Sequence, residues 1–390
     1  MLGSAWLGRS GVAAKPGLCS AGAERFRIWF PAGECYPLSV LALQAVTPEF
    51  LARELEDVSL ADARRILAQV HRSGHLETPL ANVRRAALAS ARRAGHVPRL
   101  EVVRQPHSSL DPFVKLAFRV PSGEVVESVR IPLEKPGRFS VCVSSQVGCA
   151  LGCRFCATGR MGLKRNLEVW EIVEQVRELR STLNRGSGER VHGVVFQGMG
   201  EPLANLDRVL QAIAVLSDPS TLAIDMRNMT VCTSGLPTGI RRLAREAPKV
   251  RLGWSLGAPL RETRRRLMPI DDAHPFPEVM EAVVEHTRIT RRSPMWALTL
   301  LADVNDSEAD AHALADLIED FSERAGHRPR LTLIPYNSID LGGEDPFKRT
   351  SSERENRFRD VLRERGIGSH RRYSGGGDVG AACGQLAARA

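Results

Sequence analysis

Short apolar segments alternate with helical segments over most of the chain after residue 138. The apolar segments have the length of buried strands, and the segments between them have the periodicity of amphipathic helices. The predicted strands lie near residues 138–144, 192–198, 228–233, 250–256, 295–302 and 330–336. These six β–α units indicate an α/β fold with a parallel, partly closed barrel, whose functional groups lie at the carboxyl ends of the strands.

The first of these strands predicts which side chains face the barrel interior. Successive side chains of a strand point to opposite faces of the sheet. Phe139, Val141 and Val143 are apolar and can pack under the helices. We therefore expect the alternate residues, Cys142 among them, to face the cavity.

A β-hairpin is predicted before the barrel. Apolar residues alternate along 116–120, residues 121–124 make the turn, and residues 125–131 return. On the return strand, Glu127 shares a face with Val129 and other apolar side chains. A carboxylate at that position is costly unless it is paired or held neutral.

Three short helices are predicted before the hairpin. Thr47–Pro48, Ser59 and Thr78–Pro79 are helix-start signals, and the third helix ends at Gly95. Several arginines lie along this third predicted helix, where they form either a solvated face or an RNA-binding surface. They are Arg84, Arg85, Arg92 and Arg93.

The pattern divides the chain into an extension, a helical domain, a hairpin, a barrel and a tail. The predicted parts are a loosely ordered N-terminal extension (1–46), a small helical domain (47–99), a β-hairpin extension (100–135), a partial barrel (136–370) and a C-terminal tail (371–390).

Composition and charge narrow the class of protein. Hydrophobic residues make up 43% and charged residues 25% of the chain, as in ordinary soluble proteins. No apolar run approaches the roughly 20 residues of a membrane helix, so no membrane partner is expected. A formal net charge of +9 suits a polyanionic partner, although many basic proteins bind no nucleic acid.

The cysteines are concentrated in one loop. Cys149, Cys153 and Cys156 form a C-x3-C-x2-C triplet, which can hold three irons of a [4Fe–4S] cubane and leave the fourth iron open. Structural zinc prefers four protein ligands, and no second pair lies nearby to complete such a site. The open iron suits a chelating ligand such as S-adenosylmethionine, and Phe155 before the last ligand is usual in the radical-SAM signature. A labile cluster and reactive thiols require a reducing compartment, so we expect the cytoplasm.

The surrounding motifs resemble those of the radical-SAM RNA adenine methyltransferases of the RlmN/Cfr family. The resemblance covers roughly residues 100 to 386 and rests on separate segments in the correct order. These are Cys142-Val-Ser-Ser-Gln-Val-Gly-Cys149, Ala157-Thr-Gly159, Arg165-Asn-Leu167, Gly198-Met-Gly-Glu-Pro202 and Ala381-Ala-Cys-Gly-Gln-Leu386. The resemblance implies a partial radical-SAM barrel preceded by a small helical domain that helps to grip RNA.

The resemblance also implies a reaction. Family members methylate C2 or C8 of one adenosine in 23S rRNA, and the C2 enzymes also act on certain tRNAs. Two S-adenosylmethionine molecules are used per turnover: one methylates Cys383, and the other is cleaved to a radical that activates that methyl group for addition to adenine. Cys142 then releases the product by forming a transient disulfide with Cys383. Glu127, just before Ile131-Pro132, matches the family's proposed proton acceptor, and an external donor such as flavodoxin or ferredoxin supplies electrons.

The S-adenosylmethionine contacts are likewise implied by the resemblance. Gly200 and Glu201 match the family's amino-group site. Ser255, Leu256 and Asn337 match further contacts at the ends of predicted strands.

Some positions depart from the family pattern. Cys232 stands where the family has Ser, and a thiol is the weaker hydrogen-bond partner. Gly257 stands where the family has His, so the imidazole contact is missing, and the 375–380 segment is less acidic. These cofactor-site changes motivate an alternative, a catalytically impaired iron–sulfur RNA-binding paralogue, whereas retention of both Cys142 and Cys383 favours an active enzyme.

The product is not decided by the motifs. Gly198-Met-Gly-Glu-Pro202 favours the C2 branch of the family. Residues 267–292 are closer to the C8 branch. Both products therefore stay open.

Overall fold

The computed structural model describes residues 41–76, 79–339 and 345–387. Within these residues, the largest sheet has ten strands. In spatial order they are β14 (Ser369–Arg371), β13 (Arg330–Pro335), β12 (Met295–Leu300), β11 (Arg251–Ser255), β10 (Met229–Thr233), β9 (Arg190–Phe196), β6 (Arg138–Val143), β5 (Val125–Pro132), β4 (Val114–Arg119) and β3 (Glu101–Arg104).

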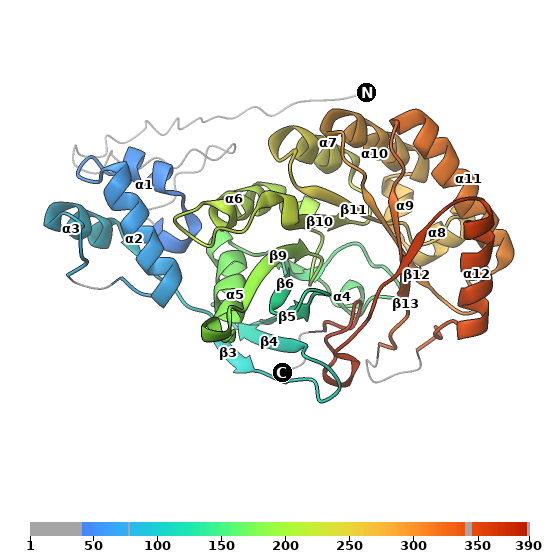
Figure 1. Ribbon diagram of the computed structural model, residues 1–390, viewed down its shortest axis with the longest axis horizontal. Coiled ribbons are helices and arrows are strands. Elements are labelled where there is room, and N and C mark those ends of the chain that lie inside the picture. The colour runs from blue at the N-terminus through green and yellow to red at the C-terminus, as the bar shows by residue number, and fades with distance from the viewer. Residues whose placement is uncertain (1–40, 77–78, 340–344, 388–390) are drawn as a thin grey trace, which may run out of the picture. The chain divides into compact units, whose positions relative to one another are not determined.

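The parallel part of this sheet confirms the barrel prediction. Strands β6 and β9 to β14 pair in parallel, each with its neighbour. Six of them coincide with the six predicted strands, and β14 is an additional edge strand that the pattern did not reveal. The helices that follow the strands lie on the outer side of the sheet (Figure 1). They are α5 (Val169–Ser181), α6 (Leu206–Ser217), α7 (Pro237–Glu246), α8 (Arg261–Leu267), α9 (Ile270–Ala273), α10 (Phe276–Thr290), α11 (Glu308–Ala325) and α12 (Ser352–Glu364).

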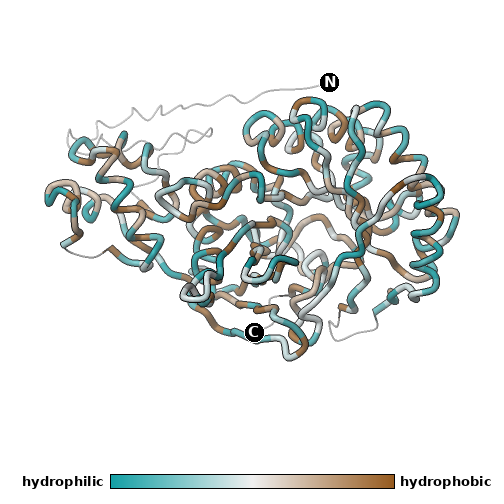
Figure 2. The backbone as a smooth tube through the Cα atoms, in the orientation of Figure 1, coloured by the Kyte–Doolittle hydropathy of each residue, from teal (hydrophilic) through white to brown (hydrophobic). Residues whose placement is uncertain are grey.

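The core lies between the sheet and these helices. Trp254 and Trp296 are register partners on β11 and β12, and their rings meet edge to face at a centroid distance of 5.1 Å. Phe321 of α11 packs on Trp296 at 5.0 Å. Figure 2 shows hydrophobic residues along the central strands and alternating hydrophobic and hydrophilic residues along the surrounding helices. This alternation is the amphipathic pattern from which the units were predicted.

The predicted hairpin is also confirmed, as strands β4 and β5. They pair antiparallel with Phe118 opposite Val126, and β5 pairs antiparallel with β6, so the hairpin extends the main sheet. Val129 of β5 lies opposite Cys142 of β6. The hairpin therefore stands directly beside the strand that carries the first candidate thiol.

A second, smaller hairpin frames the cysteine loop. It consists of β7 (Gln146–Cys149) and β8 (Gly162–Asn166), with α4 (Ala157–Arg160) between them. Gly148 has a left-handed φ of +77°, and a Cβ there would lie 1.8 Å from the Gly162 carbonyl oxygen. Only glycine permits this approach of the two strands. The loop that holds the three cysteines is thus closed at its base.

The N-terminal helices follow two of the three predicted start signals. Thr47 caps α1 (Pro48–Glu54), and Ser59 caps α2 (Leu60–Ser73). Helix α3 (Arg85–Ala94) ends as predicted before Gly95. Residues 41–42 and 95–96 pair as the short strands β1 and β2, and 43–45 form a 3-10 turn, although 41–46 had been assigned to the extension. Residues 1–40 of that predicted extension lie outside the described residues.

The predicted start of the third helix was wrong. Thr78 lies outside the described residues, and the helix begins at Arg85, not at Pro79. Asn82 has a left-handed φ of 59°, which interrupts any helix. The Arg84 guanidinium is paired instead with Asp62 of α2 at 2.8 Å, a tertiary contact that fixes the chain before the helix.

Among the described helices, none is long and apolar enough to cross a membrane.

Candidate active site

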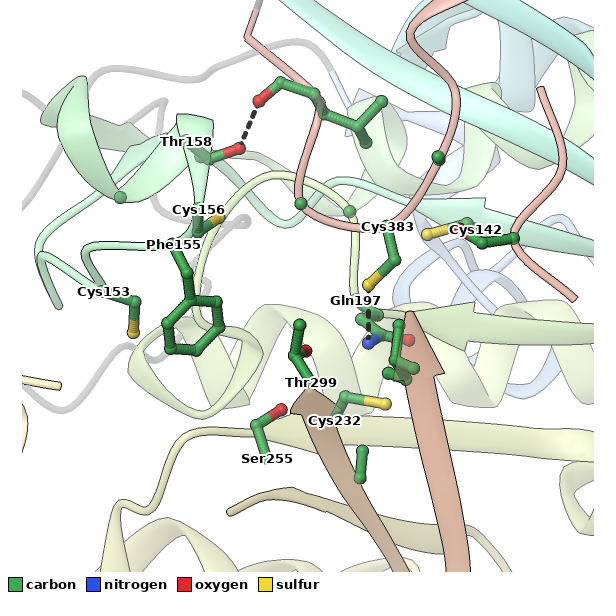
Figure 3. Close-up of a pocket in the computed structure, with 18 of the residues that line it drawn as sticks. Cys142, Cys153, Phe155, Cys156, Thr158, Gln197, Cys232, Ser255, Thr299 and Cys383 are labelled. Atoms are coloured by element: carbon green, nitrogen blue, oxygen red, sulfur yellow. Dashed lines mark hydrogen bonds between the residues drawn. The ribbon is translucent and has the colours of Figure 1, made fainter. Parts of the chain in front are cut away.

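All six cysteines of the described residues line one pocket at the carboxyl ends of the parallel strands. Cys142 comes from β6, Cys232 from β10 and Cys383 from the C-terminal tail. The remaining members are the triplet of the cysteine loop: Cys149, Cys153 and Cys156. Figure 3 shows the side chains of the pocket from these separate elements.

The triplet fits a [4Fe–4S] cluster. Burial raises the pKa of the Cys149 and Cys153 thiols to about 12, and the neighbouring sulfurs of the triplet add to the rise. Such thiols become thiolates only when a metal compensates the charge. Within the described residues, no three Cys, His, Asp or Glu side chains converge on a single ion. In a [4Fe–4S] cluster each cysteine binds a different iron.

The cysteine loop holds the tail that bears Cys383. The backbone N–H of Ala157 donates to the Gly384 carbonyl at 2.9 Å, and the Thr158 hydroxyl donates to the Leu386 carbonyl at 2.6 Å. The two donors are the first and second residues after the last cysteine of the triplet. Residues more than 220 positions apart in the chain are thereby brought into one site.

Cys142 and Cys383 face each other in this pocket. The sulfur of Cys142 points toward the Cys383 side chain (Figure 3). Burial raises the pKa of Cys142 to about 12, an effect that the Arg372 guanidinium opposes and the Cys383 sulfur increases. The prediction that Cys142 faces the cavity is therefore confirmed.

Glu127 lies beside the pocket and does not line it, whereas Val129 and Ile131 on the same strand face do. Its side chain is 2% exposed. One carboxylate oxygen pairs with the Lys115 ammonium at 3.0 Å, and the other accepts from the Ala387 backbone N–H at 3.0 Å. The carboxylate is thus paired, as its apolar surroundings require, and it also holds the tail.

Glu201 forms an anionic corner of the pocket after β9. Its carboxylate accepts hydrogen bonds from the backbone N–H groups of Ser234 at 2.9 Å and Leu203 at 3.1 Å. Burial raises its pKa to about 7, against the effect of these donors. A buried carboxylate of this kind is suited to accept an ammonium group.

The sequence comparisons agree with this geometry. Residues 143–313 match the model of the radical SAM superfamily. The chain is 60% identical over 348 residues to a probable RNA methyltransferase of Sorangium cellulosum, covering 85% of this chain and 88% of that protein. It is 42% identical to the dual-specificity RNA methyltransferase RlmN of Syntrophobacter fumaroxidans and 41% identical to the ribosomal RNA large subunit methyltransferase Cfr of Lachnoclostridium phytofermentans, each over 70% of this chain and 76% of the relative. The chain belongs to the RlmN/Cfr family.

A solved structure supports the same assignment. A radical SAM methyltransferase from Sphaerobacter thermophilus superposes with a TM-score of 0.79 at 36% identity, covering 90% of this chain and all of that one. As a radical SAM member of the RlmN/Cfr family, the chain uses a [4Fe–4S] cluster and S-adenosylmethionine.

Five of the seven positions at which the RlmN/Cfr pattern has S-adenosylmethionine contacts line the pocket, among them the two where this chain departs from the pattern. They are Gly200, Glu201, Cys232, Ser255 and Gly257. Leu256 is fully buried and is absent from the lining. Asn337 is also absent from the lining, and its amide donates to the Ser374 hydroxyl at 2.7 Å and to the Cys383 carbonyl at 3.2 Å. In this structure Asn337 anchors the tail.

Two of the departures from the RlmN/Cfr pattern, Cys232 and Gly257, fit their surroundings. Gly253, the register partner of Cys232, makes room for the thiol, because a Cβ at Gly253 would lie 2.8 Å from the Cys232 sulfur. Gly257 has a left-handed φ of +75°, and a Cβ there would lie 2.2 Å from the Met268 sulfur. A histidine at this position would therefore require the chain to move.

The structure adds functional candidates that the sequence did not reveal. Gln197 and Arg372 line the pocket and are hydrogen-bonded to each other at 3.0 Å. Gln197 follows the last residue of β9. In the sequence, only its position next to the Gly198 motif could have indicated a role in the site. Arg372 follows β14, the strand that the sequence did not predict. Lys115 is the ion-pair partner of Glu127. The sequence placed it on the hairpin but did not indicate this pairing.

Proposed function

We propose that this protein methylates a ring carbon, C2 or C8, of adenosine in 23S rRNA, with tRNA as a second substrate to be tested. The observation that supports it most is the attachment of the Cys383 tail to the cysteine loop through Ala157 and Thr158. A catalytically impaired RNA-binding paralogue would need neither this attachment nor the facing thiol of Cys142.

The division of labour follows from where the side chains lie. Cys149, Cys153 and Cys156 hold the cluster, and Glu201 accepts the ammonium of S-adenosylmethionine. When bound, these groups supply a carbon-centred radical able to activate an otherwise inert C–H bond. Two S-adenosylmethionine molecules are consumed in each turnover, one for the methyl group and one for the radical.

The chain's own thiols transfer the methyl group and release the product. Cys383 carries the methyl group and forms the bond to the adenine ring through it. The Cys142 thiol then loses its proton and attacks the Cys383 sulfur, so that an S–S bond forms as the bond from that sulfur to the transferred carbon breaks. The electron pair of the broken bond goes to the carbon, which takes up a proton and becomes the methyl group. Glu127 accepts the proton from the modified ring carbon, and its contact with Ala387 keeps it next to the tail.

Exposed arginines support two macromolecular partners, RNA and an acidic electron-donor protein. Arg85, Arg92 and Arg93 are exposed on α3 and form an RNA footprint. Arg154 and Arg160 are exposed beside the cysteine loop, where an acidic electron donor such as flavodoxin or ferredoxin can approach the cluster. The reduced thiols of the pocket suit the cytoplasm.

The test is methylation of unmodified 23S rRNA and tRNA transcripts by the reconstituted protein under anaerobic, reducing conditions. Nucleoside mass spectrometry separates 2-methyladenosine from 8-methyladenosine, and either product supports the proposal while deciding between the two carbons. Cys383→Ala is the control and should give neither. A protein that binds the cluster, S-adenosylmethionine and RNA but gives no methyladenosine would be the binding paralogue.

A further inference from the structure

Gln197 lines the same pocket as both thiols that the proposed function pairs. Its side-chain amide donates to the Cys383 sulfur at 3.4 Å (Figure 3). Gln197 follows β9, which lies between the strands bearing Cys142 and Cys232. Gln197 therefore contacts the sulfur of the tail from the end of a strand that pairs with the strand bearing Cys142.

Arg372 determines how the Gln197 amide is oriented. A guanidinium has only donors, so the atom of Gln197 that faces it must be the carbonyl oxygen. That oxygen accepts from the Arg372 guanidinium at 3.0 Å, and the amide NH₂ is consequently directed at Cys383. The orientation of this amide follows from the chemistry of its two neighbours.

The tail does not need Gln197 to stay in place. Its backbone is bound by Ala157, Thr158 and Asn337, and the Gln385 side chain donates to the Ser338 carbonyl at 3.0 Å. The contact of Gln197 is to the sulfur itself. Its contribution therefore concerns where the thiol points, since the fold of the tail is secured elsewhere.

We propose that Gln197, oriented by Arg372, is a positioning residue that aligns the Cys383 sulfur with Cys142 for thiol exchange. The inference rests on the proposed function. With the amide in place, the half-buried Cys383 side chain is kept in one orientation facing Cys142. Without it, the thiol can rotate within the pocket, and fewer encounters with Cys142 are productive.

The test measures disulfide formation directly, without RNA. Reconstituted protein with an intact cluster, checked by its visible absorption, is exposed anaerobically to oxidised glutathione, which takes up the two electrons and two protons. Acid quenching, alkylation and peptide mass spectrometry then give the rate at which the Cys142–Cys383 disulfide forms. All variants also carry Cys232→Ser, so that the third thiol of the pocket cannot compete.

Gln197→Met keeps the length of the side chain and removes the amide, and it should slow disulfide formation by about 2- to 10-fold, the effect of one lost hydrogen bond. Arg372→Met should act in the same direction, whereas Arg372→Lys retains a donor to Gln197 and should restore most of the rate. Thr299→Val is the matched control, since its hydroxyl lines the same pocket without a hydrogen bond to either sulfur, and its rate should equal that of the parent.

Three other outcomes would contradict the inference. An unchanged rate in Gln197→Met, while the parent forms the disulfide, overturns the role of Gln197 and leaves the proposed function standing. A slower rate accompanied by faster hydrogen exchange throughout residues 371–387 shows a merely structural role. A parent protein that never forms the disulfide refutes the thiol pairing of the proposed function and this inference with it.

Discussion

The hydroxyl of Thr158, two residues after the last cysteine of the triplet, donates a 2.6 Å hydrogen bond to the Leu386 carbonyl. Thr158 is 3% and Leu386 6% exposed, so water does not compete for this bond. The loop that holds the cluster and the tail that carries Cys383 are therefore joined by a buried polar contact. Assembly of the cluster loop and placement of Cys383, the proposed methyl carrier, are expected to depend on each other.

Thr158→Val tests this coupling. The substitution leaves the buried Leu386 carbonyl without a donor, at a cost of about 1–3 kcal/mol. We expect an intact cluster with faster hydrogen exchange in the tail and several-fold slower methylation. Thr158→Ser keeps the hydroxyl and should behave like the parent. Unchanged exchange in Thr158→Val would show that the bond does not hold the tail.

The cluster ligands can be tested by iron content. Replacing Cys149, Cys153 and Cys156 together by Ala should abolish the cubane absorption after anaerobic reconstitution. Cys232→Ser is the matched control, because Cys232 lines the same pocket outside the triplet. A triple variant that still binds four irons would refute the assignment.

The two exchanging thiols should fail at different steps. Cys383→Ala removes the methyl carrier, so no covalent RNA adduct can form. Cys142→Ala leaves methylation and addition intact but blocks release, so protein crosslinked to RNA should accumulate in cells. A denaturing gel with and without ribonuclease reads this out. A ribonuclease-sensitive band in both variants, or in neither while the parent methylates RNA, would contradict this division of labour.

Binding of S-adenosylmethionine should weaken in acid. Burial raises the pKa of Glu201 to about 7, so below that pH the free protein holds a neutral carboxyl group that attracts the ammonium less. Affinity measured by anaerobic calorimetry should fall by up to about tenfold for each pH unit below the pKa. Glu201→Gln should bind weakly, and its affinity should not change over that range. A parent affinity that is constant below neutral pH would exclude Glu201 as the ammonium acceptor.

Restoring the family's histidine should destabilise this chain. Gly257→His places a side chain on a left-handed backbone and against the Met268 sulfur, which we expect to cost at least about 1–3 kcal/mol. Denaturant unfolding of the purified variant measures the loss. Cys232→Ser, with no backbone constraint, should leave stability and S-adenosylmethionine affinity nearly unchanged. Equal stability of Gly257→His would mean that the loop adapts.

What the sequence could predict was local in origin. The barrel strands follow from short apolar segments, and the cysteine triplet lies within eight residues, so both are readable without tertiary information. The start of α3 was misread because Arg84 pairs with Asp62, a contact across 22 positions. Strand β14 is three residues long and pairs at a sheet edge, too short to show a period.

The direction of individual side chains was the least predictable part of the site. The RlmN/Cfr resemblance implied that Asn337 contacts the cofactor, and it did not indicate that the Asn337 amide donates to Ser374 and Cys383 of the tail. Gln197 and Arg372 are hydrogen-bonded although they lie 175 positions apart in the chain. The sequence around either residue does not indicate the other as its partner.

The anchors around Cys383 also bear on how the substrate must arrive. The Cys383 carbonyl is bound by Asn337 and the next carbonyl, that of Gly384, by Ala157, so the backbone on which the thiol stands is fastened at consecutive residues. The Cys383 side chain can therefore rotate, but the backbone that bears it is held in place. In the proposed reaction the target adenosine therefore has to leave its base stack and enter the pocket, because the thiol cannot move out to meet it.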